Sequence, residues 1–144
     1  MTLIETQITI EAPAERVWAI LTDFAKFPEW NPFIRSIVGS PKAGSRIKVQ
    51  IAPAGQSAMS FEPTVLVAEP GRELRWLGTF MTRAVFAGEH SFVLETLSPG
   101  STGLVHSGRF TGLMVPLIMS GKMLAATKQG FVAMNEALKK RAEA

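Results

Sequence analysis

Two histidines, His90 and His106, are the only ones in the sequence and are the side chains best suited to acid–base chemistry near neutral pH. Cysteine and tyrosine are both absent, which removes thiolate nucleophiles, cysteine-based zinc sites and a phenolic acid. The serines form no GxSxG pattern, and no GxxxxGK[ST] or GxGxxG phosphate loop occurs. We therefore expect no bound metal, nucleotide or other cofactor.

The turn between the two histidines predicts how far apart they lie. The sequence SPGSTG (98–103) indicates a hairpin turn between two strands. If the turn centres near Gly100, Phe92 opposes Gly108 on the neighbouring strand. His90 and His106 then share the inner face of the hairpin but are separated by roughly 13 Å along the strands. We therefore expect that they share no metal ion, and that His90 is a polar anchor, a general acid or base, or an ordinary core histidine.

Composition and charge are those of a globular protein with a large core. The chain has 144 residues, 47% of them hydrophobic and 19% charged, which predicts one domain over residues 1–144. The formal net charge is +3, but the cations are scattered and their only run, residues 139–141, ends a predicted helix. We expect no nucleic-acid binding, because no basic stripe with interleaved aromatic residues is present. The sequence has no long apolar stretch and no basic leader segment, so we expect a cytoplasmic protein without stable membrane insertion.

Hydrophobic periodicity predicts an α+β order of elements. A strand over residues 3–10 is followed by a short helix over residues 14–22, which Pro13 introduces. Pro63 makes one of the later strands an edge or bulged strand. Because hairpin turns connect these strands, we expect an antiparallel sheet. The later strands are expected over residues 34–38, 46–51, 61–69, 74–80, 85–97 and 104–114.

The last segment, residues 116–142, is predicted to be one long helix that covers the sheet. Gly121 and Gly130 interrupt it and indicate bending or close packing. Met119 and Met123 lie near its start, and methionine either fills irregular apolar gaps or adapts to ligands. Its apolar stripe, repeated every seven residues, consists of Leu117, Leu124, Phe131 and Leu138.

Four segments of the sequence, in this order, carry a family resemblance: ITIEAPAERVWAILTDFAKFPEWNPFI (8–34), ELRWLG (73–78), GEHSFVLE (88–95) and TGLVHSGRFTG (102–112). Together with the terminal helix they resemble the START-like (SRPBCC) superfamily, and within it the polyketide cyclase/dehydrase and lipid-transport group. The resemblance implies a helix-grip fold. In this fold a curved antiparallel sheet of about seven strands wraps around a long C-terminal helix, two short helices follow the first strand, and a cavity lies between sheet and helix.

The superfamily includes aromatase/cyclases, lipid and sterol carriers, plant hormone receptors and ubiquinone-binding proteins, so the resemblance implies a small hydrophobic ligand as partner. In several members an acidic residue precedes the RF of the penultimate motif, where this chain has Gly108. That departure removes a catalytic carboxylate. Three functions stay open: a carrier or sensor of a hydrophobic molecule, a cyclase/dehydratase-type enzyme using the same cavity, and an interaction module using the basic helix end. We expect the first, because few polar groups converge on the inner face.

The segment FPEWNPFI (27–34) is rich in aromatic rings although two prolines exclude a regular strand. In the implied fold, Trp30 and Phe33 either cover the mouth of the cavity or plug the core. We expect His90 to orient a ligand by a hydrogen bond rather than by charge, since an apolar wall disfavours the imidazolium. The expected pocket is lined by Trp30, Phe33, Trp76, Phe86, His90, Phe92, Phe110, Met119, Met123 and Phe131.

Overall fold

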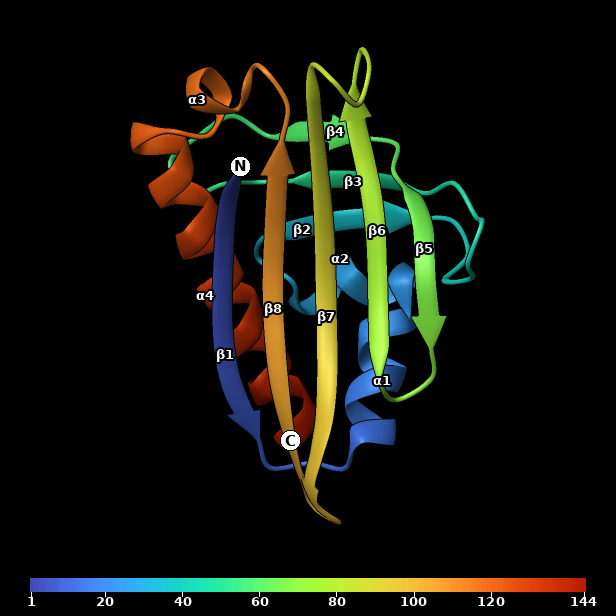
Figure 1. The fold of residues 1–144 in the computed structure, drawn as a ribbon. Coiled ribbons are helices and arrows are strands. Elements are labelled where there is room, and N and C mark those ends of the chain that lie inside the picture. Colours follow the sequence, from blue (N-terminus) through green and yellow to red (C-terminus); the bar gives the residue numbers. More distant parts are fainter.

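Eight strands form two antiparallel sheets in the computed structural model, which describes residues 1–144. The larger sheet has the order β1-β8-β7-β6-β5 and the smaller one β2-β3-β4 (Figure 1). The strands of the larger sheet are β1 (Thr2–Ile10), β5 (Thr64–Glu69), β6 (Glu73–Phe80), β7 (Phe86–Ser98) and β8 (Ser101–Thr111). Those of the smaller sheet are β2 (Ile34–Val38), β3 (Lys48–Ile51) and β4 (Met59–Phe61).

The strand count exceeds the expected seven because the segment predicted as one strand, residues 61–69, is two. Proline has no backbone N–H to give to a ladder, and Pro63 lies in the gap between the end of β4 at Phe61 and the start of β5 at Thr64. Its carbonyl accepts a hydrogen bond from the N–H of Ile47 (2.9 Å), so the break is itself held in place. The α+β helix-grip prediction is confirmed, with the chain passing from one sheet to the other at this proline.

Five helical segments complete the chain: α1 (Ala14–Thr22), the 3₁₀ turn η1 (Phe24–Lys26), α2 (Phe27–Trp30), α3 (Val115–Ile118) and α4 (Gly121–Glu143). The prediction of a continuous helix over 116–142 was wrong at its start, because a break at Met119 and Ser120 separates α3 from α4. Gly121 adopts φ +53°, a left-handed backbone that favours glycine. Leu117 falls on the far side of that break and is 73% exposed, so it does not belong to the apolar stripe that buries Phe131 and Leu138.

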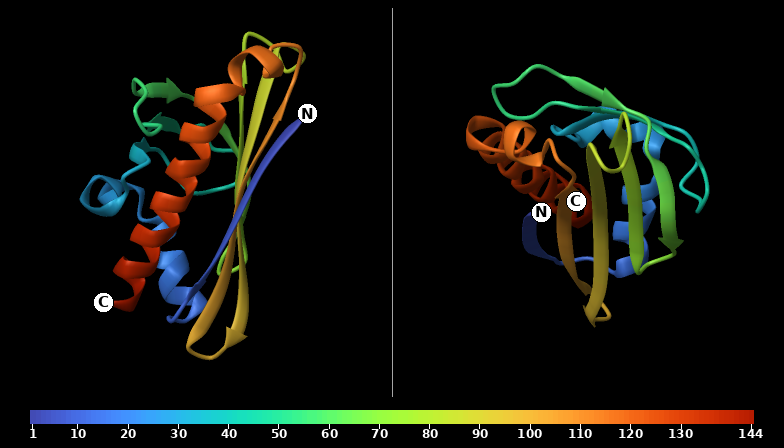
Figure 2. Two further views of the ribbon diagram at one scale, coloured as in Figure 1. Left: turned by 90° about the vertical axis from the view of Figure 1, so that its left-hand side faces the viewer. Right: turned by 45° about the horizontal axis from the view of Figure 1, so that its top comes forward.

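The helix α4 and the small sheet lie on the same face of the larger sheet, whose other face is uncovered (Figures 1 and 2). A cluster of 24 buried residues fills the space between these layers. Two side chains fasten the end of α4: Arg16 Nε donates to the carbonyl of Ala142 (2.6 Å), and Lys139 Nζ donates to the carbonyl of Thr9 (2.9 Å). None of the helices combines the length and the apolar composition needed to cross a bilayer.

Candidate functional site

The two histidines are in direct contact on the covered face of the larger sheet. His90 pairs with Gly108 and Phe92 pairs with His106 across β7 and β8. The Nε2 atoms of the two imidazoles are 2.6 Å apart and share a hydrogen bond. The expected separation of roughly 13 Å was therefore wrong, although both side chains do occupy the predicted inner face.

A chain of hydrogen bonds continues from this pair into the core. Nδ1 of His106 lies 2.7 Å from Oδ1 of Asn135 on α4, and Nδ2 of Asn135 donates to Oγ1 of Thr6 on β1 (2.8 Å). The Thr6 hydroxyl in turn donates to the backbone carbonyl of His106 (3.0 Å). The chain thus joins three elements, and His106, Asn135 and Thr6 are all buried. Each link is costly to break, because an unpaired buried polar group loses roughly 1–3 kcal/mol of stability.

Aromatic rings enclose both imidazoles. The ring of His106 stacks on Phe131, with centroids 4.1 Å apart and an interplanar angle of 8°. His90 has ring centroids of Phe92 and Phe131 each at 4.9 Å and that of Trp76 at 5.0 Å. None of these neighbours carries a charge, so nothing near the pair compensates an imidazolium.

The surroundings make both histidines weak bases. Burial lowers the pKa of His106 to about 3, although its hydrogen bonds to Asn135 and to the Phe131 backbone act in the opposite direction. Burial is also the main reason that the pKa of His90 lies well below its ordinary value of 6.5, and the neighbouring His106 lowers it further. Both rings are therefore neutral at pH 7. No group of three or more His, Cys, Asp or Glu side chains is arranged to hold a metal ion.

Five of the ten side chains expected to line a pocket belong to one aromatic cluster around the histidine pair. This aromatic cluster consists of Phe33, Trp76, His90, Phe92, His106 and Phe131, with Phe33 reaching Phe131 at 5.5 Å. The rings of Phe86 and Phe110 form a neighbouring pair with centroids 6.0 Å apart. A Cβ built at Gly108 would come within 3.0 Å of both Phe110 and Phe131, so the glycine leaves room for these two rings.

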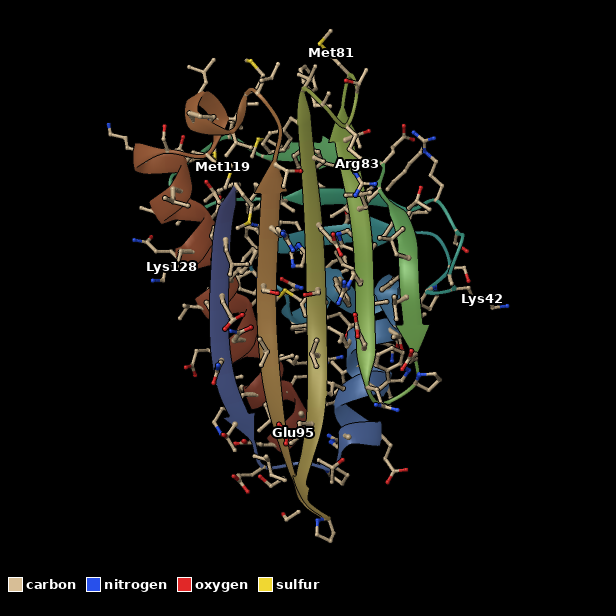
Figure 3. The ribbon with its side chains drawn as sticks, viewed as in Figure 1. Lys42, Met81, Arg83, Glu95, Met119 and Lys128 are labelled. Atoms are coloured by element: carbon tan, nitrogen blue, oxygen red, sulfur yellow. The ribbon has the colours of Figure 1, made fainter.

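The two methionines of the set lie near the start of α4. Met119, between α3 and α4, is buried, and Met123 is partly buried against the core. Figure 3 shows Met119 at the end of the molecule where α3 meets α4. Trp30 lies elsewhere, since its ring packs against Phe27 at 5.1 Å, and its Nε1 is buried without a partner.

The segment FPEWNPFI folds onto α4 through one asparagine and one glycine. Oδ1 of Asn31 accepts hydrogen bonds from the N–H groups of Phe33 (2.9 Å) and Ile34 (2.8 Å), which shapes the bend after α2. A side chain at Gly130 would overlap the ring of Phe33, so this glycine permits close packing of the segment on the helix. Phe33 is therefore buried against α4 and the ring of Phe131.

Accessibility on the inner face of β7 rises toward one end of the molecule. Phe92 is 1% exposed, whereas His90 and Phe86, further toward the β6–β7 turn, are only partly buried. On β8, His106 is fully buried while Phe110 is partly accessible. In Figure 1 this is the upper end, where both α3 and the β6–β7 turn lie. The space between the larger sheet and α4 therefore has a closed half, around Phe92 and His106. Its open half begins at His90 and includes Phe86 and Phe110.

Two surface hollows lie away from the aromatic cluster. One, of about 420 Å³, lies on the uncovered face of the larger sheet and is bordered by residues such as Gln7, Val93 and Val105. The other, of about 390 Å³, lies beside α2 and β3 and is bordered by Pro28, Arg35 and Gln50. Neither contains a residue of the expected pocket.

Sequence reasoning missed His106, Asn135 and Thr6 as members of the site. The sequence pattern does single out Thr6, because it is the one polar residue in the inward-facing series Ile4, Thr6, Ile8 and Ile10 of the first strand. Asn135 is a second such residue: it follows Phe131 by one helical turn and lies on the buried side of α4. A polar residue at an apolar periodic position requires a buried partner, and here the partners are one another.

Comparison with family models finds one match over nearly the whole chain. The model described as polyketide cyclase/dehydrase and lipid transport matches residues 1–143. No curated protein matches the sequence.

Solved structures with the same fold come from several organisms. Zhui aromatase/cyclase from Streptomyces sp. R1128 has a TM-score of 0.79 and 19% identity, with 99% of this chain and 93% of that chain covered. A START superfamily protein from Mycobacterium smegmatis has a TM-score of 0.73 and 20% identity, covering 98% of this chain and 97% of the other. Norcoclaurine synthase from Thalictrum flavum, solved with a transition state analogue, has a TM-score of 0.71, 12% identity and coverages of 98% and 93%. At these identities the likeness shows the fold.

Proposed function

This chain belongs to the polyketide cyclase/dehydrase and lipid transport family, and from that premise we propose that it binds a small hydrophobic molecule between the larger sheet and α4. Family and fold support a ligand-binding or a cyclase/dehydrase role. Binding without chemistry, of a lipid or an aromatic polyketide, is the function that the local geometry favours. The ligand site is the open half of the inner face, with His90 as its polar anchor and Phe86, Phe110, Met119 and Met123 among its walls.

The observation that carries the proposal is a free ring nitrogen in an apolar wall. Nε2 of His90 is bonded to His106, but Nδ1 has no partner within the protein. The buried side-chain nitrogens that lack a partner are Trp30 Nε1, Asn31 Nδ2 and Arg75 Nε, and Nδ1 of His90 is not among them. The side chain of His90 is only partly buried, at the start of the open half. Sites for small molecules typically combine apolar walls with a few polar groups that fix orientation.

A catalytic role for the same residue is the second candidate, favoured by its neutral state. A neutral imidazole with a free nitrogen has the form of a general base. An efficient base, however, has a pKa near the operating pH, and burial holds the pKa of His90 well below 6.5. Proton abstraction by His90 would create a cation among Trp76, Phe92 and Phe131, with no carboxylate beside it. Binding is therefore the preferred function, with cyclase/dehydratase-type chemistry as the alternative.

The expected affinity is modest. Burying about 200 Å² of apolar ligand surface contributes about 5 kcal/mol, before the cost of association is subtracted. Five kcal/mol corresponds to a Kd of roughly 0.2 mM before that cost, so flat aromatic compounds and lipids are expected to bind in the millimolar range, with weak discrimination by apolar contacts alone.

Tryptophan fluorescence tests the proposal, because Trp76 is in contact with His90 and Trp18 is not part of the aromatic cluster. Naphthalene and 2-naphthol are titrated into the protein while its emission is recorded. We expect saturable quenching that Trp76→Phe removes and that the control Trp18→Phe retains. Absence of saturable quenching in the wild type would exclude binding of these compounds. Loss of quenching in Trp18→Phe but not in Trp76→Phe would place the binding site near Trp18 instead.

A further inference from the structure

The hydrogen-bond chain behind His90 has a defined direction, which starts at Thr6. A threonine hydroxyl has one hydrogen, and that of Thr6 is given to the carbonyl of His106 at 3.0 Å. Its oxygen therefore accepts from Nδ2 of Asn135 at 2.8 Å. The Asn135 amide is thereby oriented, with its nitrogen toward β1 and its oxygen toward His106.

The same logic places the proton on each imidazole. Oδ1 of Asn135 can only accept, so Nδ1 of His106, 2.7 Å away, carries a hydrogen. A neutral imidazole has a single N–H, which makes Nε2 of His106 an acceptor. Nε2 of His90, 2.6 Å away, must then be the donor, and Nδ1 of His90 is left with a lone pair. Every donor in the chain points from His90 toward the core.

The free nitrogen of His90 is therefore a hydrogen-bond acceptor that cannot donate. On the assumption that the proposed function is correct, we propose that the ligand is a neutral hydroxyl compound, a phenol or an alcohol, whose O–H donates to Nδ1 of His90. Thr6, Asn135 and His106 act as positioning residues that keep this nitrogen in its acceptor form.

Competing ligand chemistries fit the site less well. Carboxylates, ethers and ketones have no hydrogen to give, so each leaves Nδ1 unpaired and places its own oxygen against a lone pair. Aliphatic amines are cationic near neutral pH, and the rings of Trp76, Phe92 and Phe131 surround His90 without any anion in contact. Because a buried group without its partner is penalised, a methyl ether is expected to bind roughly 10- to 100-fold more weakly than the corresponding phenol.

The proton positions are tested without any ligand. Long-range ¹H–¹⁵N correlation spectra of histidine-labelled protein distinguish protonated from unprotonated ring nitrogens. We expect His90 protonated at Nε2 and His106 protonated at Nδ1. A His90 ring protonated at Nδ1 in the wild type would overturn the inference, whatever any variant does.

A variant tests the role of the positioning residues. Asn135→Leu removes the only side-chain acceptor of His106 and leaves it the Phe131 backbone, so we expect a measurable shift of protons to Nε2 of His106 and Nδ1 of His90. Thr127→Val is the matched control, because Thr127 is also buried on α4 but its hydroxyl bonds only to the Met123 carbonyl (2.7 Å). Unchanged tautomers in folded Asn135→Leu would show that the chain does not set them.

Ligand preference is tested with three probes of one shape: 2-naphthol, 2-methoxynaphthalene and 2-naphthoate, measured by isothermal titration calorimetry. We expect 2-naphthol to bind roughly 10- to 100-fold more tightly than the other two, and this ratio to fall in His90→Phe. Equal affinities for naphthol and its methyl ether would overturn the hydroxyl inference while leaving the proposed binding function intact. Failure of all three probes and of naphthalene to bind would overturn both.

Discussion

Acid is expected to destabilise this protein well above the pH at which its carboxylates titrate, because the neutral His106 is fully buried and the neutral His90 is partly buried beside it. An unfolded histidine gains a proton near pH 6.5, whereas the folded state resists protonation of His106 until its pKa of about 3. The unfolded state therefore binds more protons throughout this window, so stability is full above pH 6.5 and is lost as the pH falls.

The size of the effect follows from the shift. Each pH unit inside the window costs about 1.4 kcal/mol for a fully shifted histidine, so His106 alone loses about 2 kcal/mol between pH 7 and pH 5. His90 adds a loss of the same sign, because its pKa is also lowered. Glu143 belongs to a different window: its lowered pKa makes its contribution disappear only below about pH 4.5.

The assay is urea unfolding at pH 7, 6 and 5, followed by circular dichroism. We expect the free energy of unfolding to fall steadily over this range, and the double variant His90→Gln/His106→Gln to have a flatter profile. A wild-type stability that is constant between pH 7 and pH 5 would refute the assignment of two buried neutral imidazoles. An equally steep profile in the folded double variant would assign the proton uptake to other groups.

Two further predictions concern packing. Gly130→Ala should destabilise the protein by roughly 1–3 kcal/mol in urea unfolding, because the added Cβ overlaps the Phe33 ring; Gly100→Ala meets open space and should change little. Phe131→Asp should prevent cooperative folding by placing a carboxylate in the core, whereas Leu117→Asp, at a 73% exposed position, should stay within about 0.5 kcal/mol of the wild type. A thermal melt of Phe131→Asp that matches the wild type would contradict the packing of α4.

The order of elements and the covered face of the sheet were predictable from the sequence because they depend on local periodicity. Alternation along residues 85–97 and 104–114 assigned His90, Phe92 and His106 correctly to the inner face. The partner positions across the hairpin depend on the turn, and there the prediction failed by two residues. Ser98 pairs with Ser101, and an irregularity at Leu97 then shifts the pairing so that Thr96 faces Thr102. The shift keeps each side chain on its face but moves it along the partner strand.

The hydrogen-bond chain could not be assembled from the sequence for a related reason. Thr6 and Asn135 are separated by 129 residues, and their contact with His106 requires the register of β1 on β8 and the placement of α4. Polar residues at apolar positions indicate that partners exist, but only the tertiary structure identifies them. The glycine at position 121 likewise indicated bending or close packing of the helix. The sequence did not indicate the left-handed backbone of Gly121 or the exposure of Leu117.

The location of the ligand is the central claim, and the methionine methyl groups test it most directly. The chain has seven methionines, of which Met119 and Met123 border the proposed site, while Met81 is 79% exposed at the tip of the β6–β7 turn (Figure 3). Protein labelled with ¹³C at the methionine methyls is titrated with 2-naphthol and followed by ¹H–¹³C correlation spectra. We predict saturable shifts at Met119 and Met123 with Met81 unchanged. Saturable shifts confined to Met81, or no saturable shift at Met119 and Met123, would contradict a site between the sheet and α4.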